Sequence, residues 1–547
     1  MEAEQKERKK IGIITFFLAI NLFLNGLLGI LRDRLLVSRF STAILDTYSA
    51  AFRLPDFVYS ILILGALGSV FIPIFTRWIT KNKKEEAFLF ANSVINLSLI
   101  ILIPFCLLLI IFTPYVLKII IPGFDIQRYQ NTIILTRILL FSPIFFGMSG
   151  IFGSILNSFK EFIIYSFSPI AYNLGIIFGI LFLSDSWGIY GAAWGAVIGS
   201  FLHFLIPFLA SFKYGYRYKP VINFNHEGIK TMKQMIGFRV FDILTTQMTW
   251  YFYTFLGSFL RPGSIAILDL TNHIQNFPLL IFSSTFTNAI FPYLSEKVAL
   301  GEKEKFLQDI NWAIRQLLFL ILPVSVAFIV LRAQIVRLIL GSQIFTWEDT
   351  QLAAAMLLVF ALSLPAQSLY LPLYRAFYAI LDAKTPTKIG IVTSLINIII
   401  AFVLVQPFFL SYYQALFNIK GDVRALGLVV AFAVAVYFNT FILFLYFHKR
   451  LGGINFKKII SSFLKISFAS ILMGFLMYQS LYFIAPLVNM RKFWGILIQT
   501  LGATLVGFLI YIISCWFLKI EEKDFVKNIF SNRFVFLRKF KLSQLLK

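Results

Sequence analysis

Long apolar stretches separated by short polar segments run through the whole chain. A helix needs about 20 predominantly apolar residues to cross the hydrocarbon core of a bilayer, and stretches of that length recur from end to end. No polar segment is long enough to form a soluble domain. The pattern predicts an all-α polytopic membrane protein with fourteen spans, near residues 11–37, 51–76, 87–117, 131–156, 164–184, 188–211, 235–259, 264–294, 309–331, 351–378, 386–406, 424–447, 459–485 and 493–518.

The distribution of Lys and Arg between these spans predicts the orientation. With the N-terminus in the cytoplasm, the cytoplasmic loops and tail carry roughly thirty Lys and Arg and the opposite loops roughly nine, which is a strong positive-inside bias. Both termini are therefore expected in the cytoplasm. The C-terminal tail alternates basic and aromatic residues, which is typical of a helix lying on an anionic leaflet.

An internal repeat divides the chain into two similar halves. Pro73 and Pro292 are 219 residues apart, as are Pro104 and Pro323, and VFIPIF around the first matches AIFPYL around its counterpart. Six spans repeated as six, plus two extra spans, predict two parallel six-helix lobes that face each other across a central cavity. This is transporter architecture working by alternating access. The predicted divisions are an N-lobe at 1–211, a cytoplasmic linker at 212–234, a C-lobe at 235–447, two further spans at 448–518, and a basic cytoplasmic tail at 519–547.

Composition agrees with the membrane class. Hydrophobic residues make up 59% of the chain and charged residues 14%, with a mean hydropathy of +0.83, against roughly 25% charged residues in soluble domains. The net charge of +24 would suggest nucleic acid binding in a soluble protein. Here it follows from the basic loops, so no nucleic acid partner is expected. Cys106 and Cys515 both lie in apolar runs, which supports neither a disulfide nor a thiolate metal site.

Enzyme signatures are absent from the sequence. The four histidines are scattered, and neither HExxH nor GxxxxGK[ST] occurs. Because nothing indicates a nucleotide, metal or prosthetic group, we expect a non-enzymatic transporter without a cofactor. A coupling cation or the membrane potential would then supply the energy.

Charged residues inside the first predicted span are the first candidate site. Arg32 and Asp33 lie in GILRDRLLV, where an ion costs at least about 2.5–3.5 kcal/mol at mid-span. Asp33 cannot extend to the interface and therefore needs a partner, so we expect Arg32 and Asp33 to form a pair in a water-filled cavity. Arg34 and Arg39 are expected to reach the headgroups instead. Asn25 is a further polar candidate on this span.

Other polar candidates lie in later spans. Asp46 and Arg53 are close to the start of the second span, and Arg53 could either line the cavity or lie at the membrane interface. The segment LTNHIQNFP places Asn272, His273 and Asn276 in an apolar span, where they could bind a polar head group or hold helices together. A further ionic candidate is Arg375.

Several segments resemble the MurJ (MviN) family of lipid II flippases. The matching segments are NGLLGILRDRLLV, DTYSAAFRLPD, GALGSVFIPIF, ILNSFKEFIIYSFSPIAYNLGII, PGSIAILDLTNHIQNFP and FYAILDAKTPTKIGIV, in order over some 400 residues. The resemblance implies the fold of the multidrug/oligosaccharidyl-lipid/polysaccharide exporter superfamily, two six-helix lobes plus two helices that form a groove for a polyprenyl tail. It also implies transfer of an undecaprenyl-linked peptidoglycan precursor across the bacterial cytoplasmic (inner) membrane, with other cell-wall synthesis proteins as partners.

By motif position, Arg32, Asp33, Asp46 and Arg53 match the family, and Arg32 would contact the pyrophosphate. An Arg fork suits a diphosphate. Positions where the family has basic or acidic residues differ here: they are Asn25-Gly26, Tyr59-Ser60, Leu64 and His273. Arg375 lies one turn beyond a family Lys and could compensate in part, so a net cationic cavity is still expected. The alternatives are a flippase for another polyprenyl-linked saccharide, a multidrug exporter of the same superfamily, and a non-transporting cell-wall scaffold.

Overall fold

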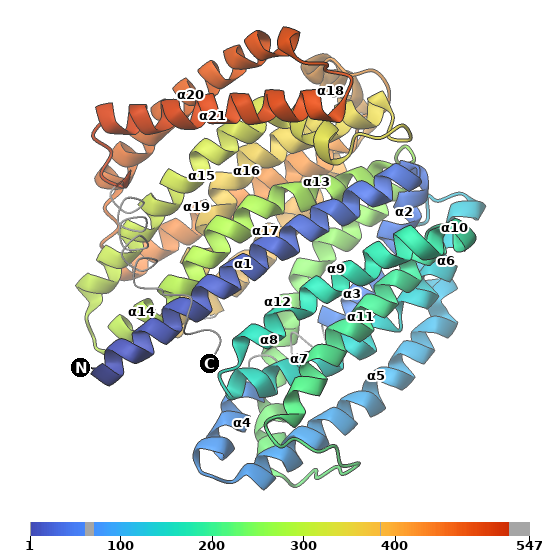
Figure 1. Ribbon diagram of the computed structural model, residues 1–547, viewed down its shortest axis with the longest axis vertical. Helices are drawn as coiled ribbons and strands as arrows, with labels where there is room; N and C mark the ends of the chain where they lie inside the picture. The colour runs from blue at the N-terminus through green and yellow to red at the C-terminus, as the bar shows by residue number, and fades with distance from the viewer. Residues whose placement is uncertain (1, 61–70, 383, 524–547) are drawn as a thin grey trace, which may run out of the picture. The chain divides into compact units, whose positions relative to one another are not determined.

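The computed structural model describes residues 2–60, 71–382 and 384–523, and within these ranges the regular structure is entirely helical (Figure 1). Eleven helices or helix pairs in this part of the chain are long and apolar enough to cross a membrane. They are Lys84–Ile120, Ile126–Ser158, Phe162–Trp187, Ile189–Phe212, Ser264–Ala299, Lys303–Ile339, Trp347–Ala379, Lys384–Leu404, Leu426–Leu451, Phe456–Leu487 and Phe493–Phe517. The all-α polytopic class is confirmed, and the count of fourteen spans stays a prediction.

The three other expected spans fall on α1 (Glu2–Arg39), on α12 (Glu227–Ser258), and on a stretch that includes α3 (Arg53–Tyr59) and α4 (Phe71–Thr80). Residues 61–70 between α3 and α4, with Leu64, lie outside the described residues. Most of the predicted basic tail, residues 524–547, also lies outside them.

The chain divides into two compact units. Unit 1 comprises Met1–Ile274, Ile339–Met356 and Gly390–Ala435, and unit 2 comprises Gln275–Leu338, Leu357–Ile389 and Val436–Lys547. The unit boundaries pass through four helices and also separate the last residue of α15 (Lys303–Ile339) from the rest of that helix. The predicted lobe boundaries near 211 and 235 stay a prediction. Besides the helices already given, the helices wholly in unit 1 are α2 (Thr42–Ala51), α5 (Lys84–Ile120), α6 (Ile126–Leu139), α7 (Ser142–Ser158), α8 (Phe162–Ser166), α9 (Ser168–Phe178), α10 (Ser184–Trp187), α11 (Ile189–Phe212) and α18 (Leu410–Phe417).

The helices of unit 2 are α14 (Thr285–Ala299), α20 (Phe456–Ile484), α21 (Phe493–Phe517) and nearly all of α15 (Lys303–Ile339). The helices that the boundary divides are α13 (Ser264–Pro278), α16 (Trp347–Ala379), α17 (Lys384–Leu404) and α19 (Leu426–Leu451).

Helix lengths support the internal repeat. Pro104 lies inside α5 and Pro323 inside α15, and both helices are 37 residues long. The two helices begin and end 219 residues apart, the same spacing as that of the prolines. Two matched helices with matched internal prolines indicate that the repeat in the sequence is a repeat of structure.

Glycines bring α9 and α11 into close contact in unit 1, where the two helices run side by side (Figure 1). A Cβ added at Gly195 would lie 2.7 Å from the Cα of Gly179 and 2.8 Å from the carbonyl oxygen of Gly175. Small residues let helix backbones approach closely within a membrane, where packing rather than the hydrophobic effect holds helices together. These glycines fix the position of α9, which carries Tyr172 and Asn173 of the site described below.

We therefore expect Gly195→Ala to destabilise the protein. The added methyl group meets only backbone atoms, which cannot rotate away, and such overpacking costs about 1–3 kcal/mol. This exceeds the gain of about 1 kcal/mol in helix propensity from Gly to Ala. The apparent Tm of the full chain in detergent should fall. The control is Gly29→Ala on α1, where an added Cβ has no atom within 4 Å. Equal Tm values for the two variants would contradict the close packing.

In unit 2, α20 and α21 form a helical hairpin (Figure 1). The side-chain amide of Gln499 donates to the backbone oxygen of Leu481, at 2.9 Å, and joins the two helices near their connection. Tyr511 on α21 donates to the backbone oxygen of Phe319 on α15, at 2.8 Å. The hairpin is therefore anchored to α15, and much of its remaining surface is aliphatic and aromatic.

Candidate substrate-binding cavity

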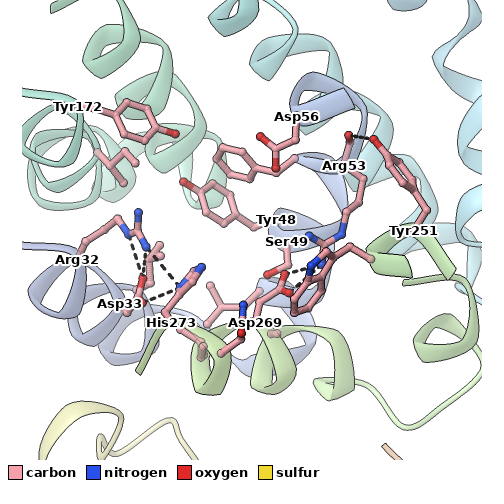
Figure 2. A pocket seen from close by; sticks show the side chains of 18 of the residues that line it. Arg32, Asp33, Tyr48, Ser49, Arg53, Asp56, Tyr172, Tyr251, Asp269 and His273 are labelled. Carbon is pink, nitrogen blue, oxygen red and sulfur yellow. Dashed lines mark hydrogen bonds and ion pairs between the residues drawn. The ribbon is translucent and has the colours of Figure 1, made fainter. Parts of the chain in front are cut away.

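A cavity of about 360 Å³ lies within unit 1. Residues of α1, α2, α3, α9, α12 and the first turns of α13 line it. Its charged or titratable lining residues, apart from tyrosines, are Arg32, Asp33, Arg53, Asp56, Asp269 and His273 (Figure 2). Six such side chains around one cavity of an apolar helical protein identify it as the candidate site, because ions within a membrane are costly unless they are paired or hydrated.

Arg32, Asp33 and His273 form a hydrogen-bonded group on one side of the cavity. The Nε and Nη2 atoms of Arg32 donate to Oδ1 of Asp33, at 2.9 and 2.7 Å. Nδ1 of His273 lies 2.9 Å from Oδ2 of the same carboxylate, so the carboxylate joins α1 to α13. The Asp33 side chain is only 3% exposed, whereas that of His273 is 47% exposed. The expected Arg32–Asp33 pair is present, and its imidazole partner faces the cavity.

Asn25 supports this group without lining the cavity. Its side-chain oxygen accepts a hydrogen bond from Asn173, at 2.9 Å, and Asn173 accepts one from Nη1 of Arg32, at 3.3 Å. This chain of amides fixes the guanidinium plane. Asn272, in contrast, lines the cavity directly.

Arg53 and Asp269 form a second ion pair in the cavity. Nη2 of Arg53 lies 2.8 and 2.7 Å from the two carboxylate oxygens of Asp269. Nε of Arg53 donates to Thr254, at 2.7 Å, and the Tyr251 hydroxyl donates to the backbone oxygen of Arg53. The guanidinium also lies over the ring of Trp250, 5.9 Å from its centroid. Of the two positions that the sequence left open for Arg53, the structure supports the cavity lining.

Asp46 is buried beside the cavity and positions α13. Its carboxylate oxygens accept hydrogen bonds from the backbone N–H groups of Gly263, at 2.6 Å, and Ala266, at 2.8 Å, where α13 begins. A carboxylate at a helix N-terminus satisfies unpaired N–H groups and interacts favourably with the helix dipole. Because α13 carries Asp269 and His273, Asp46 acts on the site by holding this helix in place.

The lining of this cavity within unit 1 is not net cationic, and the expected net cationic cavity between the two lobes stays a prediction. Two arginines face three carboxylates, and a protonated His273 would only balance the sum. The excess negative charge comes from Asp56, since Asp33 and Asp269 are each paired with an arginine. Asp269 is a carboxylate inside the apolar segment SIAILDLTN, and this feature of the sequence could have identified it as a site residue.

Two predicted site residues belong to unit 2 and not to the lining of this cavity. Asn276 accepts a hydrogen bond from Gln275, at 3.3 Å. Arg375 donates to Asn288, at 3.2 Å, and its guanidinium lies 4.9 Å from the ring centroid of Phe291. Aromatic and amide residues complete the lining, and the sequence pattern did not distinguish them from packing residues: Tyr48, Phe52, Tyr172, Gln247, Trp250 and Tyr251.

Comparisons with known proteins agree on one family. The family described as lipid II flippase MurJ matches residues 39–498. The probable lipid II flippase MurJ of Borreliella burgdorferi is 30% identical over 414 residues, which cover 74% of this chain and 79% of that protein. The corresponding protein of Buchnera aphidicola subsp. Schizaphis graminum is 27% identical over 532 residues, or 96% of this chain and 98% of that protein.

Solved structures agree with the sequence comparisons. A lipid II flippase MurJ in an inward closed conformation has a TM-score of 0.75 and 25% identity, and covers 93% of this chain and 100% of its own. An inward-facing multidrug resistance MATE family transporter of the MOP superfamily has a TM-score of 0.64 at 15% identity, over 82% of this chain and 99% of its own. The second match shows the fold alone. With a family match over most of its length, this multi-pass membrane protein belongs to the MurJ family of lipid II flippases.

Proposed function

We propose that this chain moves lipid II, the lipid-linked peptidoglycan precursor, from the inner to the outer leaflet of the bacterial cytoplasmic membrane. The observation that carries the proposal is the polar cavity inside the membrane-spanning helices of a chain from this family. A lipid-linked head group cannot cross hydrocarbon unassisted, and the cavity offers it hydrated, charged surroundings at membrane depth.

The two cavity arginines suit the pyrophosphate of such a substrate. A guanidinium presents a rigid fork of donors that binds phosphate oxygens in pairs. Carboxylates occupy these forks, Asp33 on Arg32 and Asp269 on Arg53. A pyrophosphate that enters would compete with the carboxylates for the arginines. The internal pairs therefore neutralise the two arginines and can be exchanged for the substrate.

The polyprenyl tail would remain in lipid along the hairpin of α20 and α21. Side chains on this hairpin expose large apolar surfaces that fit an isoprenoid chain, among them Phe468, Ile471, Phe475, Leu505 and Phe508. This division leaves the tail in hydrocarbon and requires the cavity to accept only the polar head.

Turnover would be a transport cycle without covalent chemistry. Alternating access requires only that the substrate, and a coupling cation if one is used, bind the inward and outward states with different affinity. The membrane potential also favours outward movement of an anionic head group, by about 2.3 kcal/mol per charge per 100 mV. Cytoplasmic termini are supported by the excess of Lys and Arg in the loops on that side, and other cell-wall synthesis proteins are proposed partners.

Replacement of the resident flippase tests the function. In bacteria depleted of their own lipid II flippase, we expect this chain to restore growth and to return lipid II to the outer leaflet. The amount of lipid II in the outer leaflet can be measured by its cleavage with an added lipid II-degrading colicin. Growth without externally accessible lipid II would contradict the proposal and favour a scaffold. Restored export of a different polyprenyl-linked saccharide, or of a drug, without lipid II movement would favour the alternative transporters.

A further inference from the structure

A second cavity of about 260 Å³ adjoins the substrate-binding cavity within unit 1. The two cavities share Phe52, Asp56 and Tyr172 in their linings. The smaller one extends between α3, α7, α9 and α11 and reaches His203. Nothing in the proposed movement of a lipid head group requires this side branch, so its polar groups call for a separate explanation.

Asp56 lies where the two cavities meet. Its carboxylate is exposed to them, and it has no hydrogen bond or ion pair with any described residue. Figure 2 shows the carboxylate pointing away from the Arg53–Asp269 pair, with no dashed line reaching it. Asp33 and Asp269, the other two carboxylates of the substrate cavity, each have an arginine. Among the described residues, Asp56 is therefore the carboxylate of the substrate cavity that has no arginine in ion-pair contact.

His203 lies at the other end of the smaller cavity, and its hydrogen bonds define its tautomer. The Ser149 hydroxyl donates to the backbone oxygen of His203, at 2.9 Å, and lies 2.7 Å from Nδ1. A hydroxyl has one proton to donate, so Ser149 accepts from Nδ1–H. In a neutral ring Nε2 then carries the lone pair. The imidazole is thus set up to accept a proton at Nε2.

The smaller cavity lies between Asp56 and His203 and is large enough to hold water. A cavity of about 260 Å³ has room for several waters, since each takes up about 30 Å³ in the liquid.

We propose that the smaller cavity is a proton-binding branch of the substrate cavity, in which waters connect Asp56 to His203 and the two side chains share one transported proton. Water-filled spaces with an acidic and an imidazole side chain are typical of proton relays in membranes. A proton is favoured over Na⁺ because the branch supplies a nitrogen base, the His203 imidazole, as well as a carboxylate. The other charged and titratable groups that face Asp56 are Arg53 and Tyr59 of α3, Tyr172 of α9, Tyr251 of α12, and Asp269 and His273 of α13.

Protonation of Asp56 would affect head-group binding, a consequence that rests on the proposed function. An ionised Asp56 repels an incoming pyrophosphate. When Asp56 is protonated this repulsion is absent, and the charged groups in contact with the substrate are the two arginine–carboxylate pairs. Binding of the anionic head group would then be accompanied by uptake of a proton. The same proton would be released when the head group leaves.

Labelling with dicyclohexylcarbodiimide tests the branch without any substrate or transport. This reagent modifies protonated carboxyl groups in apolar surroundings, and mass spectrometry locates the label on the purified full chain. We expect Asp56 to be labelled, with labelling that falls as the pH is raised and the carboxyl group loses its proton. Asp33 and Asp269, held by arginines in the same cavity, serve as internal controls and should react much less. Absent or pH-independent labelling of Asp56 would overturn the proposal.

Two further experiments test the role of His203 and the identity of the bound cation. His203→Gln should raise labelling of Asp56 at neutral pH by about twofold or more, because coupled groups share a proton and its removal leaves the carboxyl as the remaining site. The control is His448→Gln, at the end of α19. An unchanged titration in His203→Gln would overturn the link to His203. Protection of Asp56 by Na⁺ but not K⁺ at constant pH would overturn the choice of a proton.

Discussion

Replacing Arg32 with alanine is expected to reduce lipid II flipping by at least about 30-fold, because truncating one member of a buried hydrogen-bonded charge pair costs about 2–5 kcal/mol. The substitution removes the guanidinium fork from the cavity and leaves Asp33 as a buried carboxylate beside His273. The chain should still insert, since the long apolar run of α1 is unchanged. The measurement is externally accessible lipid II in flippase-depleted bacteria, normalised to the amount of protein in the membrane.

A second substitution separates head-group binding from structural support. If Arg32 only neutralises Asp33, the double variant Arg32→Ala/Asp33→Ala removes both charges and should recover flipping. If Arg32 binds the pyrophosphate, the double variant remains inactive, and this is the result we expect. Arg32→Lys keeps the charge without the fork and should be intermediate. Arg39→Ala on the same helix is the control, because its ion pair with Asp185 is solvent-exposed. Wild-type flipping by Arg32→Ala would contradict the assignment.

The sequence predicted those features of the site that depend on neighbours along the chain. Arg32 and Asp33 are adjacent, and an aspartate in an apolar span requires a partner, so their pairing followed from local chemistry. The repeat followed in the same way, because its prolines recur at a fixed spacing and the helices around them have equal length. Hydropathy alone indicated the all-helical class. These inferences need no knowledge of which helices touch.

Features that depend on contacts between distant segments could not be predicted. Arg53 and Asp269 are 216 residues apart, and the register of α3 against α13 that joins them comes from tertiary packing. The same limit applies to the charge of this cavity, since the sequence does not reveal that Asp56 and Asp269 face the same space as the arginines. Asn25 and Asp46 were recognised as unusual polar residues. Their supporting roles became clear only from Asn173 and from the N-terminus of α13.

The Arg53–Asp269 pair is expected to contribute strongly to stability, because it joins α3 to α13. Its side chains are only 12% and 14% exposed, and removal of one partner from a buried pair costs about 3–5 kcal/mol, because the other charge stays buried. Asp269→Ala should therefore lower the apparent Tm of the full chain in detergent by roughly 5 °C or more. Asp185→Ala is the matched control, since the Arg39–Asp185 pair is 31% and 71% exposed and such pairs contribute about 0–1 kcal/mol.

The double variant Arg53→Met/Asp269→Leu distinguishes stability from function at this pair. Replacing both members of a buried ion pair with apolar residues of similar volume is often neutral for stability, so the apparent Tm should return close to the wild-type value. Flipping should not return, because the fork that Asp269 holds ready for the pyrophosphate is gone. Recovery of both quantities would mean that the pair only holds α3 to α13. Recovery of neither would mean that Thr254 and Trp250 depend on the guanidinium for their packing, beyond the charge it neutralises.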